Sequence, residues 1–210
     1  MKEVIVTIKR GAHALALTVV LLGAPSLALS QGDMKGMKGM VMGHEIKIPK
    51  GALYTKADVE FMQGMIAHHS QAIVMSRMAE SHGANPQVLK LSNKIDQSQV
   101  PEIRIMQAWL ERNKQFAPDT SSWRHMTMPG MLTAAQLKEL DAAKGVEFDR
   151  QYLRLMIQHH VGALKMVEDL FASPLSGQEV DVNVFANDVV TAQTTEIGIM
   201  QKLLTQLPAK

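Results

Sequence analysis

A histidine pair flanked by methionines occurs twice in this chain with identical spacing. The pattern is Met-x-x-His-His-x5-Met, formed by Met65, His68, His69 and Met75 in the first copy and by Met156, His159, His160 and Met166 in the second. Imidazole and thioether groups together are a ligand set for soft or borderline metals, above all copper. The repeat therefore predicts a metal site.

The histidine pairs must be positioned by helices. In the first copy, Met65, His68 and Met75 are separated by steps of three and seven residues, which places them on one otherwise apolar stripe of a helix. The second copy repeats this placement. The second histidine of each pair, His69 or His160, lies on the neighbouring stripe.

A second duplicated pattern supplies acidic and thioether groups on the partner helices. Burying an unpaired polar group costs about 2 to 7 kcal/mol, so a glutamate inside a helical bundle must meet another polar group or an ion. We expect one polar layer, ringed by methionines, and we take all of its members together with His69 and His160 as candidate metal ligands. The layer holds His68, His159, Glu102 and Glu196, and the methionines are Met65, Met75, Met106, Met156, Met166 and Met200.

A metal-free interpretation of the same residues stays open. A buried histidine and glutamate can satisfy each other, and a methionine at helical spacing is usually part of a core. Two matched copies favour the metal, because adjacent histidines use two helix faces and sulfur does not satisfy an imidazole hydrogen bond.

Two further groups of methionine and histidine lie outside the expected helices. Flexible tracts of this kind could capture Cu(I) in an oxidising compartment. The alternatives are a disordered tail for the first group and packing against the end of the bundle for the second. The first group is Met34, Met37, Met40, Met42 and His44, and the second is His125, Met126, Met128 and Met131.

Residues 1–30 have the pattern of a secretory signal peptide. Three basic residues within the first ten precede an apolar run over 12–22, and Ala28 and Ser30 give a small-x-small cleavage site before Gln31. The run is short for a membrane span. We expect a periplasmic or secreted protein, cleaved near Ser30 and Gln31, with an uncleaved anchor as the alternative.

The chain beyond this leader is neutral and has no cysteine. The leader holds three of the 22 basic and one of the 20 acidic residues, which leaves 19 of each sign. This balance argues against a nucleic-acid partner, and we expect no membrane association after cleavage. Without cysteine there are no disulfides and no thiolate ligands, so a soft metal must be held by methionine or histidine.

The apolar spacing is helical almost everywhere beyond residue 55. We predict an all-α four-helix bundle of two duplicated αα-hairpins, with an extra short helix in the central connection. The predicted parts are a flexible Met-rich segment over 31–55, a first hairpin over 56–116, a linker with a short helix opening at Thr133 over 117–145, and a second hairpin over 146–207, whose last helix opens at Ser176-x-x-Glu179.

These motifs resemble a secreted family catalogued as a domain of unknown function. The resemblance covers about 56–207 and rests on the two His-His repeats and on the segment from Met128 to Met131. It implies an exported ferritin-like bundle, copper or silver binding in some members and no established catalysis. By analogy, the first copper-associated positions would be His68, His69, His159 and His160.

The residues and the resemblance together predict an exported copper-binding protein. Such a protein would sequester Cu(I), and also Cu(II), or hand it to a partner protein that the sequence does not identify, and so contribute to copper tolerance. One alternative is a ferritin-like metallo-oxidase acting on copper. A di-iron centre is not favoured, because no Glu-x-x-His motif occurs. The other alternative is a metal-free helical scaffold or partner-binding module.

Overall fold

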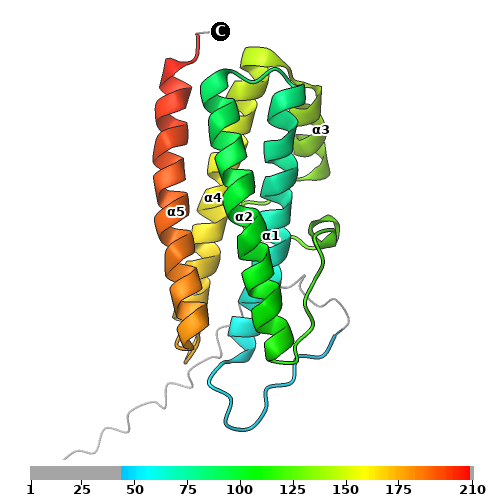
Figure 1. The fold of residues 1–210 in the computed structure, drawn as a ribbon, viewed down its shortest axis with the longest axis vertical. Coiled ribbons are helices and arrows are strands. Elements are labelled where there is room, and N and C mark those ends of the chain that lie inside the picture. The colour runs from blue at the N-terminus through cyan, green and yellow to red at the C-terminus, as the bar shows by residue number, and fades with distance from the viewer. Residues whose placement is uncertain (1–43, 209–210) are drawn as a thin grey trace, which may run out of the picture. The chain divides into compact units, whose positions relative to one another are not determined.

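The computed structural model describes residues 44–208, which form five α-helices and one short 3₁₀ turn (Figure 1). Within this range, none of the helices is long and apolar enough to cross a membrane. The elements are α1 (Lys56–Ser81), α2 (Pro86–Arg112), η1 (Ser122–Arg124), α3 (Ala134–Ala142), α4 (Gly145–Ala172) and α5 (Val180–Gln206).

The long helices form two hairpins that pack against each other. Helix α1 packs along α2, α4 packs along α5, and the two hairpins meet where α1 contacts α4. Successive long helices of each hairpin run in opposite directions, and the short helix α3 lies beside α4 (Figure 1). The all-α bundle of two αα-hairpins, with a short helix in the central connection, is therefore confirmed.

Local side chains fix most of the helix starts that the sequence indicates. Thr55 and Asp58 form a reciprocal capping box at the start of α1, in which the Thr55 amide donates to the Asp58 carboxylate over 2.7 Å. Thr133 and Gln136 form the same motif at α3. Asn85 caps α2 just before Pro86, whose missing N–H costs nothing at the first helical position.

The start of α5 differs from the predicted one. Ser176 does not cap this helix, because its hydroxyl lies 3.0 Å from the Thr55 hydroxyl at the start of α1. The backbone amide of Gly177 donates to Asp58 over 2.6 Å. These contacts hold Ser176 and Gly177 in a turn that precedes α5. Glu179 is the actual cap, and its carboxylate accepts from the Val182 amide over 3.0 Å.

The core consists of two clusters of buried side chains. One contains the first half of α1 together with the second half of α4, and the other contains the opposite halves of these two helices. This reversal is what antiparallel packing of α1 on α4 requires. The histidine pairs sit near the middle of both helices, so they lie between the two clusters.

Candidate metal centre

Two imidazoles meet at the contact between the hairpins. His68 from α1 and His159 from α4 have ring centroids 3.8 Å apart, with their planes inclined by 40°. Both side chains are buried, with relative exposures of 0% and 1%. We call His68 and His159 the inner histidines. Each hairpin supplies one of them, so the pair exists only when the hairpins are packed together.

The other two histidines bind glutamates within their own hairpins. His69 Nε2 lies 2.7 Å from Glu102 Oε2 on α2, and His160 Nε2 lies 2.9 Å from Glu196 Oε2 on α5. We call His69 and His160 the outer histidines. The sequence predicts that the glutamates share a layer with the inner histidines, and the structure corrects this pairing. They pair with the outer ones because the neighbouring stripe of α1 or α4 faces the second helix of the same hairpin.

These hydrogen bonds fix which imidazole nitrogens can act as ligands. A carboxylate or carbonyl oxygen only accepts, so Nε2 of His68, His69 and His160 carries the donated proton. The Nδ1 atoms of all four histidines, and also Nε2 of His159, are buried and have no hydrogen-bond partner among the described residues. A metal-ligating imidazole commonly donates its other N–H to a carboxylate or backbone carbonyl, which is the arrangement found here.

Burial keeps the inner histidines neutral. Desolvation, with a smaller contribution from His69, lowers the pKa of His68 to about 3. The pKa of His159 is lowered well below its usual range, again by burial first and by the neighbouring histidines second. Burial also lowers the pKa of His160, although Glu196 opposes this shift. The inner rings therefore present unprotonated nitrogen at neutral pH, as a metal ligand must.

The candidate methionines lie on both sides of the histidines and are fully buried. One core cluster contains Met65, Met106 and Met166, and the other contains Met75, Met156 and Met200. Across the part of the chain that the structure describes, no group of three or more His, Asp and Glu side chains is arranged to hold a metal ion.

Two buried glutamines, which are not among the predicted ligands, lie one helical turn before the glutamates. Gln99 and Gln193 are 2% and 3% exposed, and their Oε1 atoms have no hydrogen-bond partner within residues 44–208. They precede Glu102 and Glu196 by three residues in the two hairpins. Their matching positions in the two hairpins, three residues before each glutamate, were the signal that could have identified them.

The central loop closes over His68. The Pro129 carbonyl accepts a hydrogen bond from His68 Nε2 over 3.1 Å. The backbone at Gly130 lies against α4, where a Cβ added to Gly162 would be only 2.0 Å from the Pro129 oxygen. Gly130 itself has a φ of +78°, which favours glycine. The contact of the Pro129 carbonyl was not predictable from side-chain types. A glycine inside a helical pattern, Gly162, is nevertheless typical of a helix on which another backbone segment packs closely.

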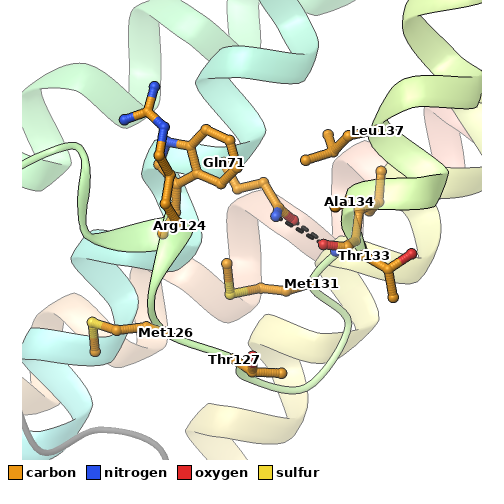
Figure 2. Close-up of a pocket in the computed structure, with 10 residues that line it drawn as sticks. Gln71, Arg124, Met126, Thr127, Met131, Thr133, Ala134 and Leu137 are labelled. Atoms are coloured by element: carbon orange, nitrogen blue, oxygen red, sulfur yellow. Dashed lines mark hydrogen bonds between the residues drawn. The ribbon is translucent and has the colours of Figure 1, made fainter.

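Gln71, one turn further along α1, forms hydrogen bonds with the same loop. Its amide donates to the Leu132 carbonyl over 3.1 Å and accepts from the Leu132 N–H over 2.7 Å. Figure 2 shows this side chain reaching the segment beside Thr133, at a cavity of about 520 Å³. Met126 and Met131 are among the residues that line this cavity. The loop is thus held both at an inner histidine and at Gln71.

The two secondary groups of candidate ligands are not gathered at the centre. Met34, Met37, Met40 and Met42 lie outside the described residues. His44 is exposed and stacks on Phe116, with ring centroids 3.9 Å apart. His125 is exposed as well. Met126 and Met128 are buried in a core cluster, and Met131 packs against it, which agrees with the packing alternative for the central loop.

Comparisons with known proteins identify the family. The sequence model for a domain of unknown function, DUF305, matches residues 58–204. The search of curated proteins finds no match. A DUF305 fragment from Deinococcus radiodurans is 31% identical with a TM-score of 0.65, over 73% of this chain and 99% of that one. A DUF305 protein from Streptomyces coelicolor, described as a candidate secreted protein, is 30% identical with a TM-score of 0.62, over 71% and 93%.

A third similar structure is that of a metal-binding protein. CopM in its Cu(I)-bound form is 27% identical with a TM-score of 0.57, over 71% of this chain and 96% of that one. CopM has also been solved in Cu(II)-bound and Ag-bound forms. The match to the family model spans both hairpins and both histidine pairs. This chain belongs to the DUF305 family.

Proposed function

We propose that this chain is an exported copper-binding protein, which holds Cu(I) and also Cu(II) at the histidine cluster and sequesters the metal or passes it on. The observation that carries the proposal is the set of four buried imidazoles whose Nδ1 atoms have no hydrogen-bond partner among the described residues. An unpaired buried polar atom is costly, and coordination would satisfy it.

The chemistry of the surrounding groups supports copper over harder metals. Thioether sulfur is a soft ligand that favours Cu(I), whereas imidazole serves both oxidation states. The glutamates orient the outer imidazoles and raise their basicity, which assists Cu(II). CopM, which shares this fold, has been solved with Cu(I), Cu(II) and Ag. We therefore expect silver to compete with Cu(I) at the same cluster.

Export is supported by the amino-terminal sequence. Residues 1–30 carry the signal-peptide pattern, and the similar Streptomyces coelicolor protein is described as a candidate secreted protein. In an oxidising compartment, a copper site without cysteine is protected from inactivation by disulfide formation.

An anaerobic Cu(I) titration against a competing chelator tests the bundle site. We expect the chain beginning at Gln31 to bind Cu(I), and the variant H68A/H159A to lose more than about 100-fold in affinity at the bundle, because both inner ligands are absent. The matched control is H125A, which removes an exposed imidazole and should leave this affinity unchanged. Unchanged affinity and stoichiometry in H68A/H159A, with the helical circular dichroism intact, would contradict the proposal.

A further inference from the structure

The two outer histidine–glutamate pairs have different electrostatic surroundings. Glu196 has a side-chain exposure of 3%, and its Oε1 lies 3.5 Å from the ammonium group of Lys94, which reaches it from α2. The side chain of Glu102 is 26% exposed, and His69 is its only ion-pair partner among the described residues. The His160–Glu196 pair thus has an ammonium group beside it, whereas the His69–Glu102 pair has none among the described residues.

The two hairpins have matching sequence positions, so the counterpart of Lys94 in the second hairpin can be identified. Lys94 lies eight residues before Glu102 on α2, and the residue eight positions before Glu196 on α5 is Asp188. This position is basic in the first hairpin, where Lys94 contacts Glu196, and acidic in the second. Symmetry therefore offers Glu102 no equivalent ammonium group.

We propose that Lys94 makes the two sides of the metal centre unequal, so that copper binds first on the His69–Glu102 side and only later, more weakly, on the His160–Glu196 side. This inference rests on the proposed function and adds an order of filling. Lys94 is a specificity-determining residue in this scheme and is not itself a ligand.

The charges on each side explain the order. With neutral imidazoles, the His69–Glu102 pair carries one negative charge, whereas His160, Glu196 and Lys94 together carry none. A cation approaching His160 meets the field of the ammonium group, and Glu196 divides its hydrogen-bonding capacity between His160 and Lys94. A carboxylate that is partly neutralised raises the basicity of its imidazole less, so that imidazole is the weaker ligand.

The order can be measured by isolating each side of the centre. In a His69→Ala background, which leaves His160 as the only outer histidine, Lys94→Gln should tighten Cu(II) binding about tenfold at low ionic strength. The gain should shrink as salt is added, because the exposed part of Lys94 is screened. Competition titration gives the affinity, and electron paramagnetic resonance reports which imidazole nitrogens bind Cu(II).

Matched variants separate the effect of this contact from that of net charge. Lys90→Gln removes the same charge from an exposed lysine one turn before Lys94 on the same helix, and should change the affinity less than twofold. Lys94→Arg keeps the charge and should behave as the parent. In a His160→Ala background, Asp188→Lys should weaken Cu(II) binding at the His69–Glu102 side.

The outcomes distinguish this inference from the proposed function. If the chain with all histidines binds no copper at the bundle, both are overturned. If it binds copper but Lys94→Gln has no more effect than Lys90→Gln, only the order of filling is overturned. A tenfold gain restricted to Lys94→Gln supports both. Thermal unfolding of each metal-free variant verifies that it is folded.

Discussion

At the scale of single residues, the notable property of the centre is that its inner histidines stay neutral inside the core. The pKa of His68 is lowered to about 3 and that of His159 is lowered well below its usual range, in both cases mainly by burial. In the unfolded chain both side chains return to the ordinary value of about 6.5. The histidines therefore link folding to pH.

This link predicts how the metal-free protein responds to acid. Between the two pKa values the unfolded chain binds a proton that the folded chain does not, so the free energy of unfolding falls as pH decreases below about 6.5. Each histidine contributes about 1.4 kcal/mol per pH unit to this fall in the free energy of unfolding. The contribution of His68 stops growing near pH 3, where the folded state binds the proton as well. Denaturant unfolding between pH 4.5 and 8 should show a shallower slope in His159→Leu than in the parent.

The exposed His125 provides the control for this measurement. His125→Ala should retain the parent slope, because this exposed imidazole lies outside the buried histidine pairs and its removal leaves their burial unchanged. Carboxylates also contribute to the pH dependence, but they are common to all three proteins. A slope in His159→Leu equal to that of the parent would show that the inner imidazoles become protonated without unfolding.

Residue types and spacing predicted that His68 and His159 face the interior, but not which histidine each glutamate contacts. The helical stripes placed His68 and His159 inward, and both are buried at the contact between the hairpins. The partner of each glutamate could not be predicted, because it depends on how far each hairpin is rotated about its own axis. Lys94 was also missed, because a surface lysine carries no signal until its contact with Glu196 is seen.

At the scale of elements, the loop from Met128 to Leu132 and the middle of α4 are fitted backbone to backbone. The ideal Cβ position at Gly162 is 2.4 Å from the Pro129 carbonyl carbon and 2.5 Å from the Gly130 Cα. Neither atom belongs to a side chain that could rotate away. The loop can lie across His68 only because α4 has glycine at this position.

A pair of glycine substitutions tests this contact. Gly162→Ala should lower the free energy of unfolding by about 1 to 3 kcal/mol, because the loop must move and the His68–Pro129 hydrogen bond is strained or lost. Gly198→Ala, in α5 where an added Cβ meets nothing within 4 Å, should instead raise it by about 0.5 to 1 kcal/mol through helix propensity. Denaturant titration of both variants gives the comparison. Equal effects would mean that the loop does not depend on Gly162.

The helices themselves were largely predictable from local signals. Apolar periodicity and capping signals located the starts of α1, α3 and α4 to within one residue, at 56, 133 and 146. The start of α5 was wrong, because Ser176 and Gly177 bind the cap of α1 and so prefer a turn to a helix. That preference arises from residues more than a hundred positions away, which local patterns do not record.

At the scale of the whole bundle, the centre joins two halves of the chain. The inner histidines come from opposite hairpins, so bound copper would cross-link α1 to α4. A ligand that binds only the folded state stabilises it by an amount that grows with the ratio of free ligand to dissociation constant, about 2.7 kcal/mol at a ratio of 100. We therefore expect copper binding at the inner histidines to be coupled to the packing of the hairpins.

Calorimetry tests this coupling directly. Adding Cu(I) under anaerobic conditions should raise the melting temperature of the chain beginning at Gln31 in a concentration-dependent way, and a chelator should reverse the rise. The same addition should leave the melting temperature of H68A/H159A nearly unchanged. A rise of similar size in both proteins would place the stabilising copper away from the inner histidines.

The bundle architecture was predictable because the duplication is visible in the sequence. Two segments with the same polar spacing imply two similar hairpins, and burial of both histidine stripes brings them face to face. The contact of the central loop with His68 was not predictable, because it is made by a backbone carbonyl and depends on the path of a segment without periodicity.

The matching histidine–glutamate pairs have a consequence for the origin of the protein. Each pair lies within one hairpin, and the inner histidines meet across a contact that uses the same face of both. A symmetric dimer of one ancestral hairpin would create the same arrangement around its twofold axis. Lys94 and Asp188 carry opposite charges at matching positions, so at this place the two hairpins depart from such symmetry.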